Sequence, residues 1–476
     1  MSALTPCSWP AKSPEPSRSA AGRTTCCIVD DEAMSIYPYA THRSALLERL
    51  SRDQIAAVIP TATTKVRNDD SDYRFRPTSD FWYLSGFAEP AACLVLLPAR
   101  DGEPARSILY LRERDKEREI WDGKRLGLDR AVDAIGVDEA RNIENLWEDL
   151  ASVLKNQENI MWRFGDGEEQ DRRMLQLFTK LRDGARGNVQ PAKILMDSSP
   201  YLSEMRLIKG PEEIELMRSA AVLTAETHKA LMAKVKPGMN EAEAEAFLDY
   251  SYRKAGSTGA AYNHICAGGG NACILHYIEN NEPLRDGDLI LVDSGAERDF
   301  YAADITRTFP VNGKFSPEQR DLYEIVLRAE EASIAVVKPG VRFEDVHNTT
   351  LDVIIDGLLQ LGLLTGTPDE IKESGSYRAF FMHKTSHWLG LDVHDCGAYN
   401  VDGKSRALEP GMVLTIEPGI YVDPANEDVE ERWRGIGIRV EDDVLVTKDG
   451  HEVLTAAVPK SIEAVEAACA ADCVTS

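Results

Sequence analysis

The stretch Leu291–Phe309, LVDSGAERDFYAADITRTF, decides the fold, because it sets two aspartates at the ends of predicted neighbouring strands. The run DLILVD has the period-2 alternation of a strand, which puts Leu289, Leu291 and Asp293 on one face. A hairpin through GAERDFYAA would place Asp304 on the adjacent strand, close to Asp293. A buried carboxylate without a partner is costly, and a metal ion is one partner that would stabilise it.

Three further candidate ligands follow in the chain. They are His387 in MHKTSHWLGLDVHD, Glu417 in LTIEPGIY and Glu441 in GIGIRVEDD. Alternation puts Val413 and Thr415 on the face of Glu417, so this carboxylate also ends a predicted strand. Four carboxylates, some of them bridging, and one imidazole could hold two divalent ions ~3.5–4 Å apart that activate a shared water. The set therefore indicates a hydrolase with a two-metal site.

Each piece taken alone has an ordinary structural explanation. Asp-x-Gly and Glu-Pro-Gly are common turns, RVEDD is typical of a solvated edge, and His383 and His394 could be core histidines. Two neighbours favour a site instead. In GIGIRVED, Gly437 would let another segment approach the backbone closely, and Arg439 could hold a nearby carboxylate in place. The joint pattern outweighs the separate explanations.

A faint internal repeat covers the second half of the chain. A long predicted helix ends at VKPG 235–238, and another ends at VKPG 337–340. Each is followed by an acidic helical stretch, then by an apolar residue with a histidine (His276, His394), then by a strand that ends in a carboxylate (Asp293, Glu417). The repeat predicts two pseudo-symmetric halves whose carboxylates face each other across a central cleft.

Composition bounds the class of protein. The chain has 476 residues with 43% hydrophobic and 28% charged residues, as in globular proteins with two or three domains. A net charge of -25 argues against nucleic acid or an anionic membrane as partner. The nine cysteines include no CxxC pair, which favours reduced thiols in the cytoplasm over disulfides or a zinc site.

The domain organisation follows from changes in composition and pattern. Residues 34–205 alternate predicted helices and strands as an α/β domain, residues 206–460 hold the repeat and the candidate ligands, and residues 461–476 are expected to be a peripheral tail. Residues 1–33 are rich in Ser, Pro and Ala. They are interpreted as a disordered extension, or as the product of a start codon upstream of the natural Met34. The alternative is a mitochondrial transit peptide.

The joined motifs resemble those of the pita-bread metallopeptidases, most closely the aminopeptidase P (Xaa-Pro aminopeptidase) family. The resemblance covers roughly residues 40–455 and includes DSGAERDFYAADITRTFPVNGKFSPEQRDLYEIVL, FMHKTSHWLGLDVHDCGAY, LEPGMVLTIEPGIY and GIGIRVEDDVLVT, with TSDFWYLSGFAEP and EIWDGKRLG in the first half. Two departures lie beside the site: Lys384 stands where the family usually has Gly, and the loop NVDGKSR is longer by one residue. The resemblance implies an α/β N-terminal domain followed by an α+β pita-bread catalytic domain.

The resemblance also implies residue roles. Asp293 would bind one metal, Asp304 and Glu441 would bridge both, and His387 and Glu417 would complete the second. Glu417 would also carry a proton. The remaining implied roles are histidines around the scissile bond (His276, His383, His394), residues that line or brace the site (Tyr399, Arg406, Arg439), and residues that approach a neighbouring subunit's site in a dimer or tetramer (Asp80, Trp121).

Oxygen ligands with one imidazole suit Mn²⁺, with Zn²⁺ and Co²⁺ as alternatives. The expected activity is hydrolysis of the first peptide bond of peptides with proline second, by a metal-bridging hydroxide. A prolidase that cuts only Xaa-Pro dipeptides is the main alternative, because it shares the ligand set. Methionine aminopeptidases lack the ~170-residue first domain, and creatinase-like enzymes lack the full ligand set. A non-catalytic pita-bread binding protein is disfavoured, because all five ligand positions carry competent side chains.

Overall fold

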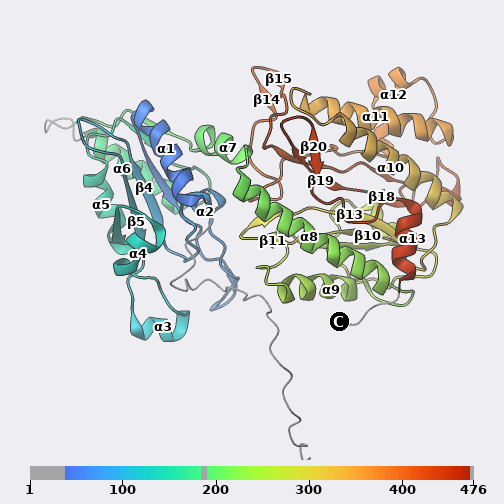
Figure 1. Cartoon of the computed structure of the whole chain (residues 1–476), viewed down its shortest axis with the longest axis horizontal. Helices are drawn as coiled ribbons and strands as arrows, with labels where there is room; N and C mark the ends of the chain where they lie inside the picture. Colours follow the sequence, from blue (N-terminus) through green and yellow to red (C-terminus); the bar gives the residue numbers. More distant parts are fainter. Residues whose placement is uncertain (1–37, 184–189, 472–476) are drawn as a thin grey trace, which may run out of the picture. The chain divides into compact units, whose positions relative to one another are not determined.

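The computed structural model describes residues 38–183 and 190–471 (Figure 1). The predicted extension 1–33 lies outside the described residues, as do positions 472–476 of the expected tail. Within the described ranges, no helix has both the length and the apolar character needed to cross a lipid bilayer.

The N-terminal domain is built on one six-stranded mixed sheet with strand order β6-β5-β4-β1-β7-β8. Its elements are α1 (Tyr39–Asp53), β1 (Ile55–Pro60), β2 (Val66–Asn68), β3 (Ser71–Asp72), α2 (Ser79–Ser85), β4 (Cys93–Leu97), β5 (Arg106–Leu111), α3 (Lys116–Asp122), α4 (Leu128–Ile135), β6 (Glu139–Asn142), the 3-10 turn η1 (Ile143–Asn145), α5 (Leu146–Val153), β7 (Asn159–Met161), α6 (Glu168–Asp183) and β8 (Ile194–Met196).

Both faces of this sheet are covered, which is why its central strands are apolar runs rather than alternating ones. Ala57 and Leu94 pack with Leu46 of α1 on one face. Val58 and Val95 pack with residues of α5 and α6 on the other. The α/β interpretation of the first half is therefore confirmed.

The C-terminal domain contains paired strands and long helices. Its elements are α7 (Ser199–Leu207), α8 (Pro211–Lys234), α9 (Glu241–Lys254), β9 (Ile265–Gly268), η3 (Gly269–Cys273), β10 (Leu289–Asp293), β11 (Glu297–Arg298), β12 (Tyr301–Ala302), β13 (Thr306–Pro310), α10 (Pro317–Val336), α11 (Phe343–Gln360), α12 (Pro368–Ser374), η4 (Ser376–Ala379), β14 (Asn400–Val401), β15 (Lys404–Ser405), β16 (Val413–Ile416), β17 (Gly419–Tyr421), η5 (Glu431–Trp433), β18 (Gly437–Arg439), β19 (Asp442–Val446), β20 (His451–Val453) and α13 (Ile462–Ala470).

The two halves of this domain repeat the same arrangement, as the sequence predicts. Helices α8 and α9 precede β10, and helices α10 and α11 precede β16. In each half, alternate strand residues enter a core that contains helix residues. Ile290 and Val292 do so in the first half, and Leu414 and Ile416 in the second. By alternation, Asp293 and Glu417 continue the other face of their strands, away from these residues.

The end of the chain differs from the expected peripheral tail. Helix α13 buries Ile462, Val465 and Cys469 in the core of the catalytic domain. These three residues recur at helical spacing, so one apolar stripe is enough to dock a short helix despite its small residues. The expectation does not hold for residues 462–470.

Candidate metal centre

Two antiparallel strand pairs position the four carboxylates. In the first, β10 pairs with β13 so that Asp293 lies opposite Thr306, and Asp304 comes just before β13. In the second, β16 pairs with β19 so that Ile416 lies opposite Asp442. Glu417 and Glu441 therefore flank the end of this pair, and each half of the domain supplies two carboxylates.

The hairpin that joins the first pair turns at Asp299 and Phe300. Both have positive φ, 47° and 67°, between the short strands β11 and β12. This is the backbone of a two-residue turn whose twist suits a hairpin. Between β10 and β11, only a glycine fits at position 295, because a Cβ there would lie 1.6 Å from the carbonyl oxygen of Ala303. This close approach holds the segments after Asp293 and before Asp304 against each other.

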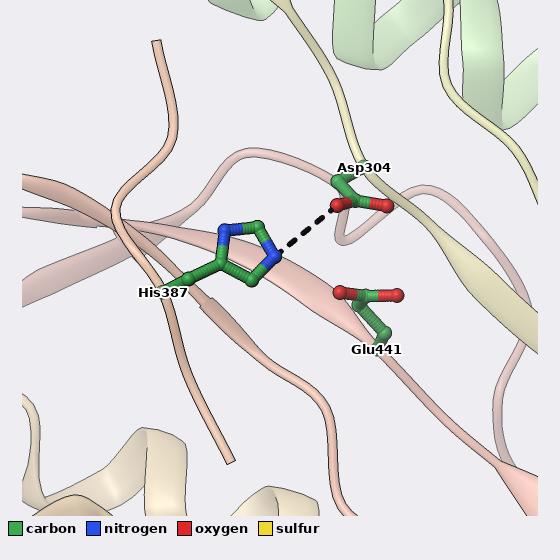
Figure 2. A group of neighbouring side chains, drawn as sticks. All are labelled: Asp304, His387 and Glu441. Atoms are coloured by element: carbon green, nitrogen blue, oxygen red, sulfur yellow. Dashed lines mark ion pairs between the residues drawn. The ribbon is translucent and has the colours of Figure 1, made fainter. Parts of the chain in front are cut away.

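Asp304, His387 and Glu441 form a tight group of potential ligands, shown in Figure 2. One ligand atom from each lies within 4.8 Å of the others. The imidazole Nε2 of His387 is 3.4 Å from Asp304 Oδ2 and 3.5 Å from Glu417 Oε1. Its Nδ1 is 3.0 Å from the carbonyl oxygen of Trp388, so Nδ1 donates there and Nε2 faces the carboxylates.

Asp293 is tied to this group by two side chains. Arg439 donates from Nη2 to Asp293 Oδ2 at 2.6 Å, which confirms that Arg439 holds a nearby carboxylate. Tyr262 donates to Asp293 Oδ1 at 2.7 Å, and its hydroxyl also contacts Oδ1 of Asp304. One hydroxyl therefore lies between the two aspartates.

Arg439 also organises the glutamate side of the site. Its Nε donates to Thr306 Oγ1 at 3.1 Å, and Thr306 donates to Glu441 Oε2 at 2.6 Å. Strand β18, which carries Arg439, also packs closely against the backbone of Ala272. This is possible because Gly437 has no side chain: a Cβ there would lie 2.4 Å from the carbonyl oxygen of Ala272. The predicted close approach at Gly437 is thus made by η3.

Three buried carboxylates of the site have raised pKa values, so a bound cation would stabilise their charged forms. Burial, followed by the charges of Asp304 and Glu417, raises the pKa of Glu441 well above its usual range. Burial raises the pKa of Glu417 to about 7, although the charges of His387 and Arg439 oppose the shift. Burial also raises the pKa of Asp304, against the hydrogen bond from His387.

His387 shows the opposite shift. Burial alone would lower the pKa of His387, but its contact with Asp304 and the charge of Glu417 raise it to about 9. A buried group of mutually repelling carboxylates draws protons when it has no metal. Hard carboxylate oxygens with one imidazole match a hard divalent cation, so the residues present fit a metal site.

Two of the three other predicted histidines, His383 and His394, lie beside this centre. His383 lies 2.9 Å from the Tyr421 hydroxyl through Nε2, and burial lowers its pKa to about 4. His394 packs edge-on against His387 with ring centroids 4.4 Å apart, and burial lowers its pKa too. His276 is exposed, and the residues on either side of it, Leu275 and Tyr277, pack with Tyr421.

Tyr399 and Arg406 lie outside the group of carboxylates. The Tyr399 hydroxyl accepts a hydrogen bond from the Trp388 amide at 3.1 Å, and the two rings stack. Arg406 donates to Glu204 at 2.7 Å and to Glu409 at 3.2 Å. Tyr399 therefore supports the backbone beside His387.

Asp80 and Trp121 differ in their exposure. Asp80 is 4% exposed and forms ion pairs with Arg206 at 2.7 Å and Arg163 at 3.1 Å. Trp121, on α3, is 85% exposed and free to contact another molecule. Within one chain neither side chain belongs to the carboxylate group.

Sequence reasoning missed three residues that complete the site: Tyr262, Thr306 and Tyr421. Thr306 lies in LVDSGAERDFYAADITRTF, two residues after Asp304, where alternation could have identified it. Tyr421 could have been identified in the same way, since it ends the LTIEPGIY motif that contains Glu417. Tyr262 stands in AAYNHICAG, where no pattern marks a ligand contact.

Comparison with known sequence families identifies both domains separately. Residues 39–162 match the family described as "Aminopeptidase P, N-terminal domain". Residues 215–448 match "Metallopeptidase family M24", a range that contains all five candidate ligands.

Individual relatives match over nearly the whole chain. The Xaa-Pro aminopeptidase of Escherichia coli is 44% identical over 90% of this chain and 96% of its own length. An aminopeptidase structure from Pseudomonas aeruginosa aligns with a TM-score of 0.87 and 45% identity, over 91% of this chain and 97% of that one. A variant of E. coli aminopeptidase P in complex with substrate aligns with a TM-score of 0.87 and 44% identity, over 90% and 97% of the two chains.

Proposed function

The chain belongs to metallopeptidase family M24, among the members that carry an aminopeptidase P N-terminal domain, and on that premise we propose that it hydrolyses the N-terminal Xaa-Pro bond of peptides. The observation that carries the proposal is the cluster of buried carboxylates around His387 in a pita-bread catalytic domain. Membership of this family, together with the similarity to Xaa-Pro aminopeptidases, identifies the chain as a metallo-aminopeptidase. The similarity to Xaa-Pro aminopeptidases over most of the chain favours this activity over a prolidase.

The proposed ligand roles follow the arrangement of the cluster. Asp293 would hold one ion, Asp304 and Glu441 would hold both, and His387 with Glu417 would hold the second. Two divalent ions bound there, Mn²⁺ by preference for this donor set, would lower the pKa of a shared water and polarise the substrate carbonyl. The tight group of Asp304, His387 and Glu441 supports a shared position for the bridging carboxylates.

Glu417 is proposed to move the proton. Its carboxylate lies 3.5 Å from His387 Nε2 and 3.8 Å from His383 Nδ1, just beyond the end of β16. From there it can accept a proton from the attacking water and pass it to the leaving nitrogen. When the second residue is proline, that nitrogen belongs to a tertiary amide without an N–H, so a dedicated proton donor matters more.

The neutral histidines are proposed to stabilise the oxyanion. Because burial lowers the pKa values of His383 and His394, both rings are neutral near pH 7 and carry one N–H each. The N–H of His383 is on Nδ1 and donates to the Lys384 carbonyl at 2.8 Å, so His383 can donate to an oxyanion only if that hydrogen bond is given up. Donors that point at the position of developing negative charge lower the barrier to acyl transfer. His276 completes this proposed set, while Arg439, Tyr399 and Arg406 hold the site in shape.

The substrate class is tested with two peptides. A metal-loaded sample should release the first residue from an Xaa-Pro-Xaa tripeptide, with slower turnover of the Xaa-Pro dipeptide. Amino-acid analysis of both reactions measures the two rates. Turnover of the dipeptide alone would assign the chain to the prolidases.

The proposal extends to assembly and location. A homo-oligomer, dimer or tetramer, would place the exposed Trp121 of one subunit near the site of its neighbour, and Asp80 would support that contact from inside. Light scattering with Trp121→Ala tests this assignment. The cytoplasm is the proposed location, or the mitochondrion if residues 1–33 act as a transit peptide. Neither nucleic acid nor membrane is proposed as a partner, given the net charge of -25.

A further inference from the structure

The loop that carries His276 depends on a buried carboxylate outside the metal centre. Glu241, the first residue of α9, is 0% exposed. Its carboxylate accepts four hydrogen bonds. Oε1 accepts from the Gly268 amide at 2.7 Å and from Asn271 Nδ2 at 3.0 Å, while Oε2 accepts from the Tyr277 hydroxyl at 2.8 Å and from the Glu282 amide at 2.9 Å.

All four donors belong to one connected segment. Gly268 ends β9, Asn271 lies in η3, and Tyr277 directly follows His276. In the described segment 274–288, the chain forms neither helix nor named strand. Residues 282–284 pair with 238–241 through backbone hydrogen bonds, including Glu241 N–H to the Glu282 carbonyl at 3.0 Å. Between 275 and 281, side-chain contacts such as those of Glu241 hold the chain in place.

The opposite side of the loop rests on the catalytic strands. The Ala272 carbonyl lies against Gly437 of β18, and the Cys273 thiol donates to the Val422 carbonyl at 3.3 Å. The loop is thus held between Glu241 and β18. Tyr277 packs in one cluster with Tyr421, and Leu275 packs against that cluster. Because the Tyr421 hydroxyl lies 2.9 Å from His383, His276, between Leu275 and Tyr277 in the chain, lies beside the histidine side of the site.

A role limited to helix capping does not account for Glu241. The start of α9 is already capped by its neighbours: Asn240 accepts from the Ala242 amide at 2.9 Å, and Glu243 accepts from the Asn240 amide at 2.9 Å. Glu241 instead buries a charge, which is unfavourable unless its hydrogen bonds compensate. Those hydrogen bonds all go to the loop.

We infer that Glu241 is a positioning residue: together with Tyr277, it holds the loop 268–282 so that His276 faces the reacting carbonyl. The inference rests on the proposed function only in assigning His276 to the reaction. It does not require Glu241 to touch substrate or metal.

Tyr277→Phe tests the inference with little disturbance, because it removes one hydroxyl and keeps the ring. A loop misplaced by about 1 Å can cost on the order of 10²-fold in rate, so we expect kcat to fall by about 10-fold or more, with KM changed less than about two-fold. Glu241→Gln should lower kcat in the same way. Glu243→Gln, on the same helix but directed at its cap, is the matched control and should keep wild-type kcat.

A double-mutant cycle separates positioning of His276 from general destabilisation. In a His276→Ala background, Tyr277→Phe should lower kcat by less than about two-fold, because residues that act through one another are not additive. Thermal unfolding of Tyr277→Phe is measured beside the control. If Glu241→Gln does not fold, Tyr277→Phe decides alone.

Two outcomes would overturn the inference: a Tyr277→Phe kcat equal to that of the control, or losses from Tyr277→Phe and His276→Ala that multiply. Both are judged against a wild-type chain that releases the first residue of an Xaa-Pro-Xaa peptide. A wild type without that activity would overturn the proposed function instead, so the two failures are distinguishable.

Discussion

Asp304 lies where the two strand pairs and His387 meet, so its substitution separates metal binding from folding. Asp304→Ala should abolish metal-dependent hydrolysis, because the carboxylate proposed to hold both ions is lost. The metal-free variant should melt no lower than the metal-free wild type, since one of several mutually repelling buried carboxylates is gone. Activity assays and thermal unfolding measure the two effects, and retained hydrolysis would refute the bridging role.

His228 is a buried neutral residue behind the site. Its Nε2 lies 3.0 Å from the Ser294 carbonyl oxygen, and burial lowers its pKa to about 4, against 6.5 in the unfolded chain. Between pH 6.5 and about 4, His228 therefore binds a proton in the unfolded state but stays neutral in the folded state. Stability is lost as the pH falls through this window, by up to about 1.4 kcal/mol per pH unit for one proton.

His228→Gln removes this proton uptake and should flatten the dependence of the melting temperature on pH between about 6.5 and 4.5. Wild type and variant are compared in one buffer series with metal bound. Parallel curves for the two proteins would show that His228 does not have the lowered pKa.

At the scale of single residues, the sequence revealed the ligands but not their supports. Asp293 ends and Glu417 follows a strand with clear alternation, Asp304 precedes the strand that pairs with the first of these, and metal-binding chemistry restricts the choice of residue type. The sequence around Tyr262 did not identify it as a site residue, because a tyrosine in such a segment can equally be an ordinary core residue. Its role depends on a tertiary contact that only the folded chain creates.

At the scale of elements, helices with end signals were predictable in detail. Helix α8 ends at Lys234, just before VKPG 235–238, where its end was predicted, and it begins at Pro211, a residue type favoured in the first turn of a helix. By contrast, Glu441 lies between β18 and β19, in a strand break that the run GIGIRVEDD does not signal. The break follows from pairing, since β18 pairs with β17 whereas β19 pairs with β16.

The hairpin between Asp293 and Asp304 makes a prediction at this scale. Gly295→Ala would force a Cβ against the Ala303 carbonyl, 1.6 Å away if nothing moved, so the two segments must separate. We expect loss of metal affinity and of hydrolysis, because two ligand carboxylates move apart. Metal titration by calorimetry measures the first effect directly.

Gly450→Ala is the matched control for this test, because a Cβ there meets no atom within 4 Å. It should bind metal as the wild type does. Equal metal affinity in Gly295→Ala and Gly450→Ala would show that the close approach at Gly295 does not set the geometry of the site.

At the scale of the whole molecule, an ion-pair network joins the N-terminal sheet domain to the catalytic domain. Arg206 on α7 is 2% exposed and donates to Asp80 at 2.7 Å and to Asp392 and Asp395 at 2.6 Å each. Lys209 also donates to Asp395, at 2.9 Å. No sequence pattern predicted this network, because its members are far apart in the chain.

Arg206→Ala should destabilise the protein by roughly 3–5 kcal/mol, since it leaves the buried carboxylates of Asp80 and Asp395 short of a partner. Thermal or denaturant unfolding measures the loss. Arg172→Ala removes an exposed arginine paired with Glu169 on α6 and should leave the melting temperature unchanged. Similar losses in both variants would mean that the buried network contributes no more than a surface pair.

Release of the first residue from an Xaa-Pro-Xaa tripeptide, followed as a function of added divalent metal, tests the central claim most directly. We predict that the metal-free chain is inactive, that activity rises with metal until the proposed two-ion site is filled, and that the products are one free amino acid and a dipeptide with N-terminal proline. Hydrolysis that persists without metal, or that occurs only with the Xaa-Pro dipeptide, would contradict the account.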